Sequence, residues 1–326
     1  MSNLKTLQKH NTDLQYLIEM AETLPEKGDF AKMADGIIDG TATEVNSGAT
    51  KIVDYAFYQR KSLKTVNIPN ANSLGDYAFS GCSALTSVDF PNVTSIGDHT
   101  FDTCPYLTSA NLPNVTSIGF WSFYKCTALT SVYFPSATSI DDYAFNSCSK
   151  LISVDFPNVT SIDSYVFQNC YKLTSANFLN APMVGSNTFN GCSALTSVNF
   201  PNATSISAGA FQSCSALTDV DFPSATSINT SAFSNCYKLK SIILRSETLC
   251  TLSNTNAFVK CYHILGTVNS THNPNGDKDG YFYVPKALVE DYKVATNWST
   301  YASQFRALED YTVDGTITGE LDPTKI

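Results

Sequence analysis

Apolar positions in the middle of the chain recur every 22 residues, a period much longer than that of a helix or a strand. The stretch CSALTSVDFPNVTSIGDHTF at 82–101 returns, slightly altered, as CTALTSVYFPSATSIDDYAF at 126–145 and as CSALTSVNFPNATSISAGAF at 192–211. Self-similarity at a fixed period predicts a repeat architecture in which each copy is one structural unit. Nine copies lie between about residues 50 and 245.

Four columns of the repeat hold the same residue type, or a close relative, in nearly every copy. The cysteine column is Cys82, Cys104, Cys126, Cys148, Cys170, Cys192, Cys214 and Cys236. The phenylalanine column is Phe57, Phe79, Phe101, Phe123, Phe145, Phe167, Phe189, Phe211 and Phe233. The leucine column is Leu63, Leu85, Leu107, Leu129, Leu151, Leu173, Leu195, Leu217 and Leu239. The branched column is Ile52, Leu74, Ile96, Ile118, Ile140, Ile162, Val184, Ile206 and Ile228.

One copy reads C-x-x-L-x-x-V-x-F-P-x-[AV]-x-x-I-x-x-x-[AST]-F. The alternation in L-x-x-V-x-F predicts a short strand with valine and phenylalanine facing inward. The following proline, Pro91 in the first quoted copy, cannot donate to a sheet and should end the strand. A second short extended piece returns isoleucine and phenylalanine to the same interior. So short a period with few helix formers predicts one coil of a solenoid, which stacks its apolar side chains on those of its neighbours.

The stretch LTSVDFPNVTSIGDHTFDTC and its copies resemble the BspA-type, or Treponema pallidum-type, leucine-rich repeat family. The resemblance covers about 200 of the 326 residues, and the copies are one residue shorter than is common in that family. It implies a right-handed leucine-rich-repeat coil built mainly from short parallel strands. Ala110 and Ala176 depart from the family pattern, because they replace the branched residue of the strand.

Both ends of the chain differ from the repeat. Residues 1–49 should form an N-terminal helix and cap, since residues 4–24 carry an apolar stripe at helical spacing. That helix could cover the first coil or form a short coiled coil that oligomerises the protein. Residues 246–326 should form an α/β C-terminal cap and tail. In this segment YFYVP at 281–285 predicts a closing strand, and two short helices should follow Pro285, with Asn297 capping the second.

The net charge of −9 and the pI near 4.8 argue against some classes of partner but do not indicate one. No cluster of lysine and arginine is present to displace counterions from phosphate, so nucleic acid is not an expected partner. No apolar run approaches 18 residues, which excludes a membrane-spanning helix. The N-terminus MSNLKTLQKHNTDLQ lacks the apolar core of a secretory signal.

The cysteines are best explained as buried thiols of the core, because residues one period apart should stack side by side and point the same way. Disulfides between adjacent coils are the alternative. Cys250 and Cys261 lie off the 22-residue column and are the strongest candidates for a disulfide if the protein has one.

Catalytic chemistry has little support in the sequence. His10, His99, His263 and His272 are scattered, and no nucleophile motif accompanies them. An enzyme would have to use His263, His272 and the acidic loop NPNGDKDGY at 273–281. That loop alternates Asn and Asp like a calcium loop but lacks the distal glutamate. The sequence predicts no catalytic residues, no cofactor and no metal site.

Two columns that vary between copies are the candidate binding residues. The first lies on the strand between the inward-facing valine and phenylalanine: Asn67, Asp89, Asn111, Tyr133, Asp155, Asn177, Asn199 and Asp221. It is flanked by Ser87, Ser109, Ser131, Ser153, Ser175 and Ser197. In leucine-rich repeats this strand face is the concave surface, which commonly binds partners. The alternative is a solvated face whose Asn and Ser side chains satisfy one another.

The second variable column precedes the Ala-Phe of each copy: Tyr55, Tyr77, His99, Trp121, Tyr143 and Tyr165. It continues with Asn187, Gly209 and Ser231, which are not aromatic. Tyrosine and tryptophan dominate binding hot spots, so the aromatic half could be a recognition surface. The alternative is that these rings shield the rim of the solenoid.

The leading hypothesis is a non-enzymatic binding or adhesion module that meets protein or glycan partners at its concave face. The resemblance implies a bacterial protein at the cell surface or secreted, in contact with host matrix or host cells. A prophage-derived structural or tail-associated protein, in a phage particle or the cytoplasm, is the alternative. In that alternative the N-terminal helix would form a homo-oligomer.

Overall fold

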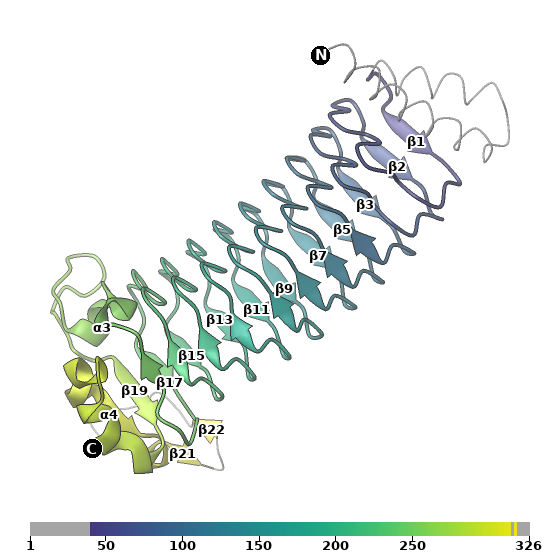
Figure 1. Cartoon of the computed structure of the whole chain (residues 1–326). Coiled ribbons are helices and arrows are strands. Elements are labelled where there is room, and N and C mark those ends of the chain that lie inside the picture. The colour runs from purple at the N-terminus through teal and green to yellow at the C-terminus, as the bar shows by residue number, and fades with distance from the viewer. Residues whose placement is uncertain (1–39, 314–315, 318–326) are drawn as a thin grey trace, which may run out of the picture. The chain divides into compact units, whose positions relative to one another are not determined.

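The computed structural model describes residues 40–313 and 316–317. The helix predicted for residues 4–24 lies outside the described residues. The chain divides into two compact units, unit 1 at Met1–Leu151 and unit 2 at Ile152–Ile326. Each unit is a stack of coils with parallel strands and few helices (Figure 1), as the period predicted. The fold is a leucine-rich-repeat β-solenoid.

Unit 1 places two sets of short strands on its coils. The three-residue strands are β1 (Glu44–Asn46), β2 (Thr65–Asn67), β3 (Ser87–Asp89), β5 (Ser109–Asn111) and β7 (Ser131–Tyr133). The two-residue strands are β4 (Ser95–Ile96), β6 (Ser117–Ile118) and β8 (Ser139–Ile140). From β3 to β7 the parallel register steps by one full repeat, so that Val88 pairs with Ala110 and Ala110 with Val132. The alanine in the strand therefore leaves the register unchanged.

Unit 2 has the same two sets of short strands, and its last strands and helices form a C-terminal cap. Its longer strands are β9 (Ser153–Asp155), β11 (Ser175–Asn177), β13 (Ser197–Asn199), β15 (Asp219–Asp221), β17 (Ser241–Ile243), β19 (Tyr281–Val284) and β20 (Phe305–Ala307). The two-residue strands are β10 (Ser161–Ile162), β12 (Met183–Val184), β14 (Ser205–Ile206), β16 (Ser227–Ile228) and β18 (Thr251–Leu252), and the hairpin β21 (Thr312–Val313) and β22 (Thr316–Ile317) follows. The helices are η1 (Thr255–Phe258), α3 (Tyr262–Leu265), η2 (Lys286–Leu288), α4 (Val289–Val294), η3 (Trp298–Gln304) and η4 (Leu308–Asp310).

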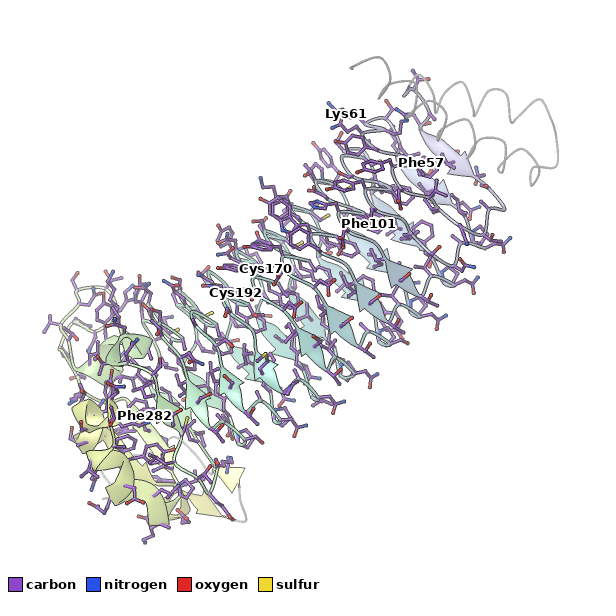
Figure 2. All side chains as sticks on the ribbon, viewed as in Figure 1. Phe57, Lys61, Phe101, Cys170, Cys192 and Phe282 are labelled. Carbon is purple, nitrogen blue, oxygen red and sulfur yellow. The ribbon has the colours of Figure 1, made fainter. Side chains whose placement is uncertain are left out.

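The invariant columns form the core of each unit. Phe57 and Phe101 lie inside the coils of unit 1, and Cys170 and Cys192 lie inside those of unit 2 (Figure 2), all fully buried. Neighbouring phenylalanines stack face to face, with ring centroids 5.1 Å apart for Phe57 and Phe79 and 5.3 Å for Phe79 and Phe101. One ring per coil therefore packs against copies of itself.

The cysteine column is a hydrogen-bonded ladder. The thiol of Cys82 donates to the carbonyl oxygen of Phe57 at 3.0 Å, and the thiol of Cys214 donates to that of Phe189 at 3.2 Å. All ten cysteines are free and buried. The ladder also contains Cys261, whose thiol donates to Phe233 O, so the expectation that Cys261 lies off the column is wrong. The last coil is longer than 22 residues, so Cys261 does not follow the sequence period, but its thiol still lies in the spatial ladder.

Each coil turns through two residues in the left-handed region, with φ between +53° and +81°. The first position holds Tyr55, Tyr77, His99, Trp121, Tyr143, Tyr165, Asn187, Gly209 and Ser231. The second holds Gln59, Gly81, Thr103, Lys125, Ser147, Asn169, Gly191, Ser213 and Asn235. At both positions the N–H group donates to the next coil, as from Tyr55 to Asp76 O at 2.8 Å and from Gln59 to Ser80 O at 2.7 Å. The turn thereby replaces a strand as the third hydrogen-bonded side of the coil.

The predicted closing strand and the two helices after Pro285 are confirmed as β19, α4 and η3. The expected capping role of Asn297 is wrong. Asn297 precedes η3, but its side chain makes no cap hydrogen bond. Its amide donates instead to Leu252 O at 2.7 Å and Ser253 O at 3.1 Å, which ties the cap to the last coil.

Candidate binding surfaces

The strand-face row has the orientation that the alternation predicted. In β3 the side chain of Val88 is buried, that of Asp89 is exposed, and Phe90 is buried again. In unit 1 the row consists of Asn67, Asp89, Asn111 and Tyr133, and in unit 2 of Asp155, Asn177, Asn199 and Asp221. The serine column beside it is exposed or half-exposed as well. Tyr133 is the one aromatic residue among the eight of the row, and it is 58% exposed.

Polar side chains of the strand-face row bond to one another. In unit 1, Asn111 Nδ2 donates to Asp89 Oδ1 at 2.8 Å. In unit 2, Asn177 Nδ2 donates to Asp155 Oδ1 at 2.7 Å, and Asn199 Nδ2 donates to Asn177 Oδ1 at 2.7 Å. These ladders match the alternative in which Asn side chains satisfy one another. They also fix the side chains of Asn111, Asn177 and Asn199, each of which is bonded to a neighbour one coil away.

One carboxylate of the strand-face row, that of Asp221 in unit 2, forms an ion pair with an arginine. Arg245 Nε donates to Asp221 Oδ1 at 3.1 Å, and Arg245 Nη2 donates to Asp221 Oδ2 at 2.8 Å. This fork geometry is the stronger form of an arginine–carboxylate pair. Asp221 is thus engaged within the protein, whereas Asp89 and Asp155 each accept from one asparagine and keep exposed carboxylates.

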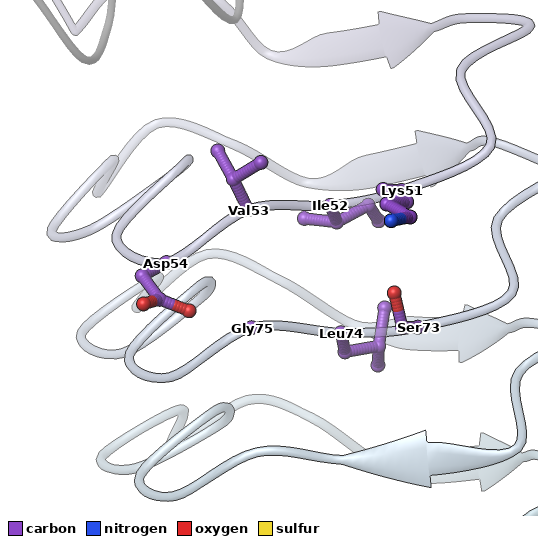
Figure 3. Close-up of a pocket in the computed structure, with 7 residues that line it drawn as sticks. All are labelled: Lys51, Ile52, Val53, Asp54, Ser73, Leu74 and Gly75. Carbon is purple, nitrogen blue, oxygen red and sulfur yellow. The ribbon is translucent and has the colours of Figure 1, made fainter.

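Two hollows mark the surface of the units. In unit 2 a hollow of about 520 Å³ lies on the strand face of β9, β11 and β13, lined by residues that include Asp155, Asn177 and Asn199. In unit 1 a smaller one of about 270 Å³ lies between neighbouring coils, with Lys51, Asp54 and Gly75 on its walls (Figure 3). The larger hollow therefore coincides with residues of the predicted binding row.

In unit 1 the aromatic row is a continuous stack. The rings of Tyr55 and Tyr77 are 4.9 Å apart and nearly parallel, and those of Tyr77 and His99 are 4.4 Å apart. His99 then meets Trp121 at 5.3 Å and a 50° tilt, and Trp121 meets Tyr143 at 5.5 Å edge to face. Tyr165 occupies the same turn position in unit 2. Tyr55 is 46% exposed, and the other rings of the row are half-buried.

A column of carboxylates precedes the aromatic row, and sequence reasoning missed it. Asp54 Oδ1 accepts from Asp76 N at 2.9 Å, Asp76 Oδ1 from Asp98 N at 2.8 Å, and Asp98 Oδ1 from Phe120 N at 3.0 Å. The signal is visible in the sequence as Asp directly before the aromatic residue at Tyr55, Tyr77, His99 and Tyr143. His99 adds a further carboxylate contact, with Nδ1 3.1 Å from Asp102 Oδ2.

The C-terminal histidines do not meet at one site. His263 Nδ1 lies 2.6 Å from Asp279 Oδ1, and Lys240 Nζ lies 2.6 Å from Asp279 Oδ2. Partial burial acts to raise the pKa of Asp279, but the hydrogen bonds from Lys240 and His263 outweigh it and lower that pKa below its usual value. The ring of His272 instead stacks on Tyr237 at 4.5 Å.

The loop at 273–281 uses its asparagine for its own turn. Asn273 is buried, its Nδ2 donates to Tyr262 O and Asp277 O, and its Oδ1 accepts from Asp277 N. The resemblance to a calcium loop is therefore explained by turn chemistry. Between residues 40 and 313, no three side chains of histidine, cysteine, aspartate or glutamate gather closely enough to hold a metal ion. No helix of the described segments is long and apolar enough to cross a membrane.

Solved structures similar to this chain include bacterial leucine-rich repeat proteins. None of the curated proteins matches the chain. Among solved structures, a leucine-rich repeat protein from Bacteroides ovatus is 22% identical over 82% of this chain and 84% of its own, with a TM-score of 0.43. The T. pallidum leucine-rich repeat protein is 24% identical over 60% and 83%, with a TM-score of 0.41. A leucine-rich cell surface protein from Faecalibacterium prausnitzii is 20% identical over 68% and 86%, with a TM-score of 0.33.

The family model of the BspA type leucine rich repeat region matches residues 50–174 and 160–274. These ranges include every coil of the 22-residue period and the longer coil that ends the cysteine ladder. The chain therefore belongs to the BspA-type leucine-rich repeat family.

Proposed function

We propose that this protein is a non-enzymatic binding module of the bacterial cell surface that holds a protein partner on its strand face. Leucine-rich repeats of this family are typical of surface proteins and of protein-interaction modules. The observation that carries the proposal is the contrast between columns. The inward columns repeat the same residue types and are buried, whereas the exposed or half-exposed strand-face row varies among Asn, Asp and Tyr.

The internal bonding of the row favours binding. A partner that docks on freely rotating side chains must order them, at about 0.5–1.5 kcal/mol for each one. Asn111, Asn177 and Asn199 are already held by a neighbour in the preceding coil. Because the amide keeps a second hydrogen and the carboxylate a second oxygen, the fixed groups still offer hydrogen bonds to a partner.

Each unit has one feature suited to an anchor. In unit 1 the exposed ring of Tyr133 follows Asp89 and Asn111 in the row, and tyrosine is enriched among residues that dominate binding. In unit 2 the hollow over β9, β11 and β13 can receive a side chain beside Asp155 and Asn177. A partner could thus engage either unit.

A binding screen against immobilised collagen, fibronectin and laminin, run beside a glycan array, tests this function. The parent chain is compared with Tyr133→Ala in unit 1 and Asn199→Arg in unit 2, the latter adding bulk at the wall of the hollow. We expect at least about tenfold weaker binding from the variant in the unit that holds the partner. Thr138→Ala, which changes an exposed residue away from the strand face, is the control. A ligand bound equally by all variants, or a response confined to glycans, would overturn the proposal.

A further inference from the structure

The rings of the aromatic row are not needed by the turn that carries them. A side chain other than glycine or asparagine in the left-handed region costs about 1–2 kcal/mol. Unit 1 places Tyr55, Tyr77, His99, Trp121 and Tyr143 there, with φ from +53° to +60°. In unit 2 Tyr165 continues the row, and the next three copies make the same turn with Asn187, Gly209 and Ser231. The solenoid can therefore form this turn with smaller residues.

Stacking of the rings contributes about as much as their backbone conformation costs. An aromatic pair contributes about 0.5–1.5 kcal/mol beyond its burial, a value similar to the backbone strain. Trp121 carries a further cost, because its indole N–H is buried and has no hydrogen-bond partner among the described residues. Because Asn187, Gly209 and Ser231 make the same turn, an aromatic residue at this position is not a requirement of the coil.

The acidic column is confined to the copies of unit 1, which also carry most of the rings. The residues directly before the row in unit 1 are Asp54, Asp76, Asp98, Phe120 and Asp142. The corresponding residues in unit 2 are Ser164, Ser186, Ala208 and Thr230. A carboxylate directly precedes the ring at Tyr55, Tyr77, His99 and Tyr143, whereas the last three copies lack both the ring and the carboxylate. Tyr165 keeps the ring without the carboxylate, and Trp121 follows Phe120. The coincidence in four of the six aromatic copies indicates that rings and carboxylates act together.

Further rings widen the row into a patch, here called the aromatic strip. It consists of Tyr55, Tyr58, Tyr77, His99, Phe120, Trp121, Tyr124 and Tyr143. Tyr58 meets Tyr55 edge to face at 5.7 Å, and Tyr124 stacks on Trp121 at 4.4 Å. The negative charges of nearby aspartates act on a tyrosine of the strip. Burial and the neighbouring Tyr55 raise the pKa of Tyr77, and the charges of Asp102, Asp76 and Asp98 raise it further.

The strip already holds one cation. Lys125 Nζ lies 4.9 Å from the ring centroid of Tyr124, a cation–π distance. A guanidinium suits such a surface better than an ammonium, because it is planar, stacks on rings and forms paired hydrogen bonds with a carboxylate. Asp54, Asp76 and Asp98 are exposed, and one oxygen of each is fixed by a backbone N–H of the next coil. The surface thus offers the carboxylates and the aromatic rings that a guanidinium recognises.

We propose that the aromatic strip of unit 1, with its column of Asp54, Asp76 and Asp98, binds an arginine-rich segment of a partner protein. The arginines insert between carboxylates and rings, and the segment follows the stacking direction of the coils. This site is separate from the strand face, so it stands or falls independently of the function proposed above.

Fluorescence anisotropy of a labelled peptide of alternating arginine and glycine, at physiological ionic strength, tests the site on the full chain. The double variant Tyr77→Asn/Trp121→Asn removes two rings without changing charge, and it uses the residue that Asn187 supplies at the same turn. Asp76→Asn/Asp98→Asn removes two charges and keeps an oxygen for the backbone N–H. We expect each pair to weaken binding about tenfold or more.

The control is Asp89→Asn/Asp155→Asn, which removes the same charge from the strand face and should change affinity less than about twofold. A lysine–glycine peptide should bind the parent more weakly than the arginine–glycine peptide. Equal losses from the two aspartate pairs would reduce the effect to general attraction by a protein of net charge −9 and overturn the proposal. Unchanged binding by the ring variant, or equal affinity for the two peptides, would overturn it as well. If the ring variant fails to fold, the two aspartate pairs decide.

Discussion

The thiol of Cys104 lies 3.2 Å from the carbonyl oxygen of Phe79 in the preceding coil and donates a hydrogen bond to it. Both side chains are fully buried. The cysteine is therefore at once a small apolar filler and a link between coils, which explains why the column holds cysteine where alanine would only fill space.

Cys104→Ala should destabilise the protein by about 1–2 kcal/mol, because it leaves a small cavity and removes the donor to Phe79. Cys104→Ser keeps a donor but buries a hydroxyl, and we expect it to lie between Ala and the parent. Thermal unfolding followed by circular dichroism measures both. A Cys104→Ala variant as stable as the parent would show that the thiol contributes nothing.

Stability should fall at alkaline pH. Burial raises the pKa of Cys82 to about 12 and raises those of Cys104 and Cys148 well above the ordinary thiol value. The unfolded chain loses these protons near pH ~8.5, so the stability that the folded state gains from its neutral thiols is complete below about that pH and is lost as the pH rises toward about 12. We expect Tm to decline steadily above about pH 9.

Circular dichroism melts between about pH 7 and about 10.5 check this dependence. Buried Tyr292 has a raised pKa and acts in the same direction, because burial also penalises its ionised form. Cys104→Ala tests the contribution of the thiols apart from that of Tyr292. It removes one buried thiol, so the fall of Tm with pH should be shallower. A Tm independent of pH over this range would contradict the prediction.

Gly119→Ala should destabilise unit 1 by about 1–3 kcal/mol through overpacking. A Cβ at this position would lie 2.8 Å from both the carbonyl carbon and the oxygen of Gly97, and these backbone atoms cannot move aside as a flexible side chain would. Asp141 holds the same position one coil later and carries a Cβ, so Asp141→Ala is the control. Similar Tm values for the two variants would show that the coils yield at this contact.

Trp298→Phe should loosen the C-terminal cap. The indole Nε1 donates to Cys250 O at 2.6 Å, and the ring is buried. Phenylalanine fills much of the space but leaves this carbonyl without its donor, at a cost of about 1–3 kcal/mol. Hydrogen exchange should show earlier opening of residues near Cys250, with little change at β11. Uniform protection in both proteins would contradict this role.

The fold was predictable because the 22-residue period of the apolar positions is visible in the sequence. A coil that packs on copies of itself repeats its inward residues, so the spacing alone assigns Cys82, Leu85, Val88 and Phe90 to the core, and all four are buried. The same logic placed Asp89 and Asn111 on the outside. It could not show that these side chains bond to each other, since that depends on the register between coils.

The left-handed turns were not predictable from residue type. Tyr77, Trp121 and Lys125 are poor candidates for positive φ, and in the first copies Gly81 alone has the residue type that favours it. The stacking of the coils imposes the conformation, because the N–H of this turn must point to the next coil. Cys261 was assigned wrongly for the opposite reason: the spatial stack continued after the sequence period changed.

Each coil contacts its neighbours through the same buried residue types. Any two copies of the repeat can therefore pack against each other in the same way. A gene with such repeats can gain or lose whole repeats by unequal recombination and still encode matching phenylalanine and cysteine ladders. Selection can then act on the number of coils, while point mutations at positions such as Asp89 and Tyr133 alter what each coil presents. In this family, the length and the specificity of the surface can therefore evolve separately.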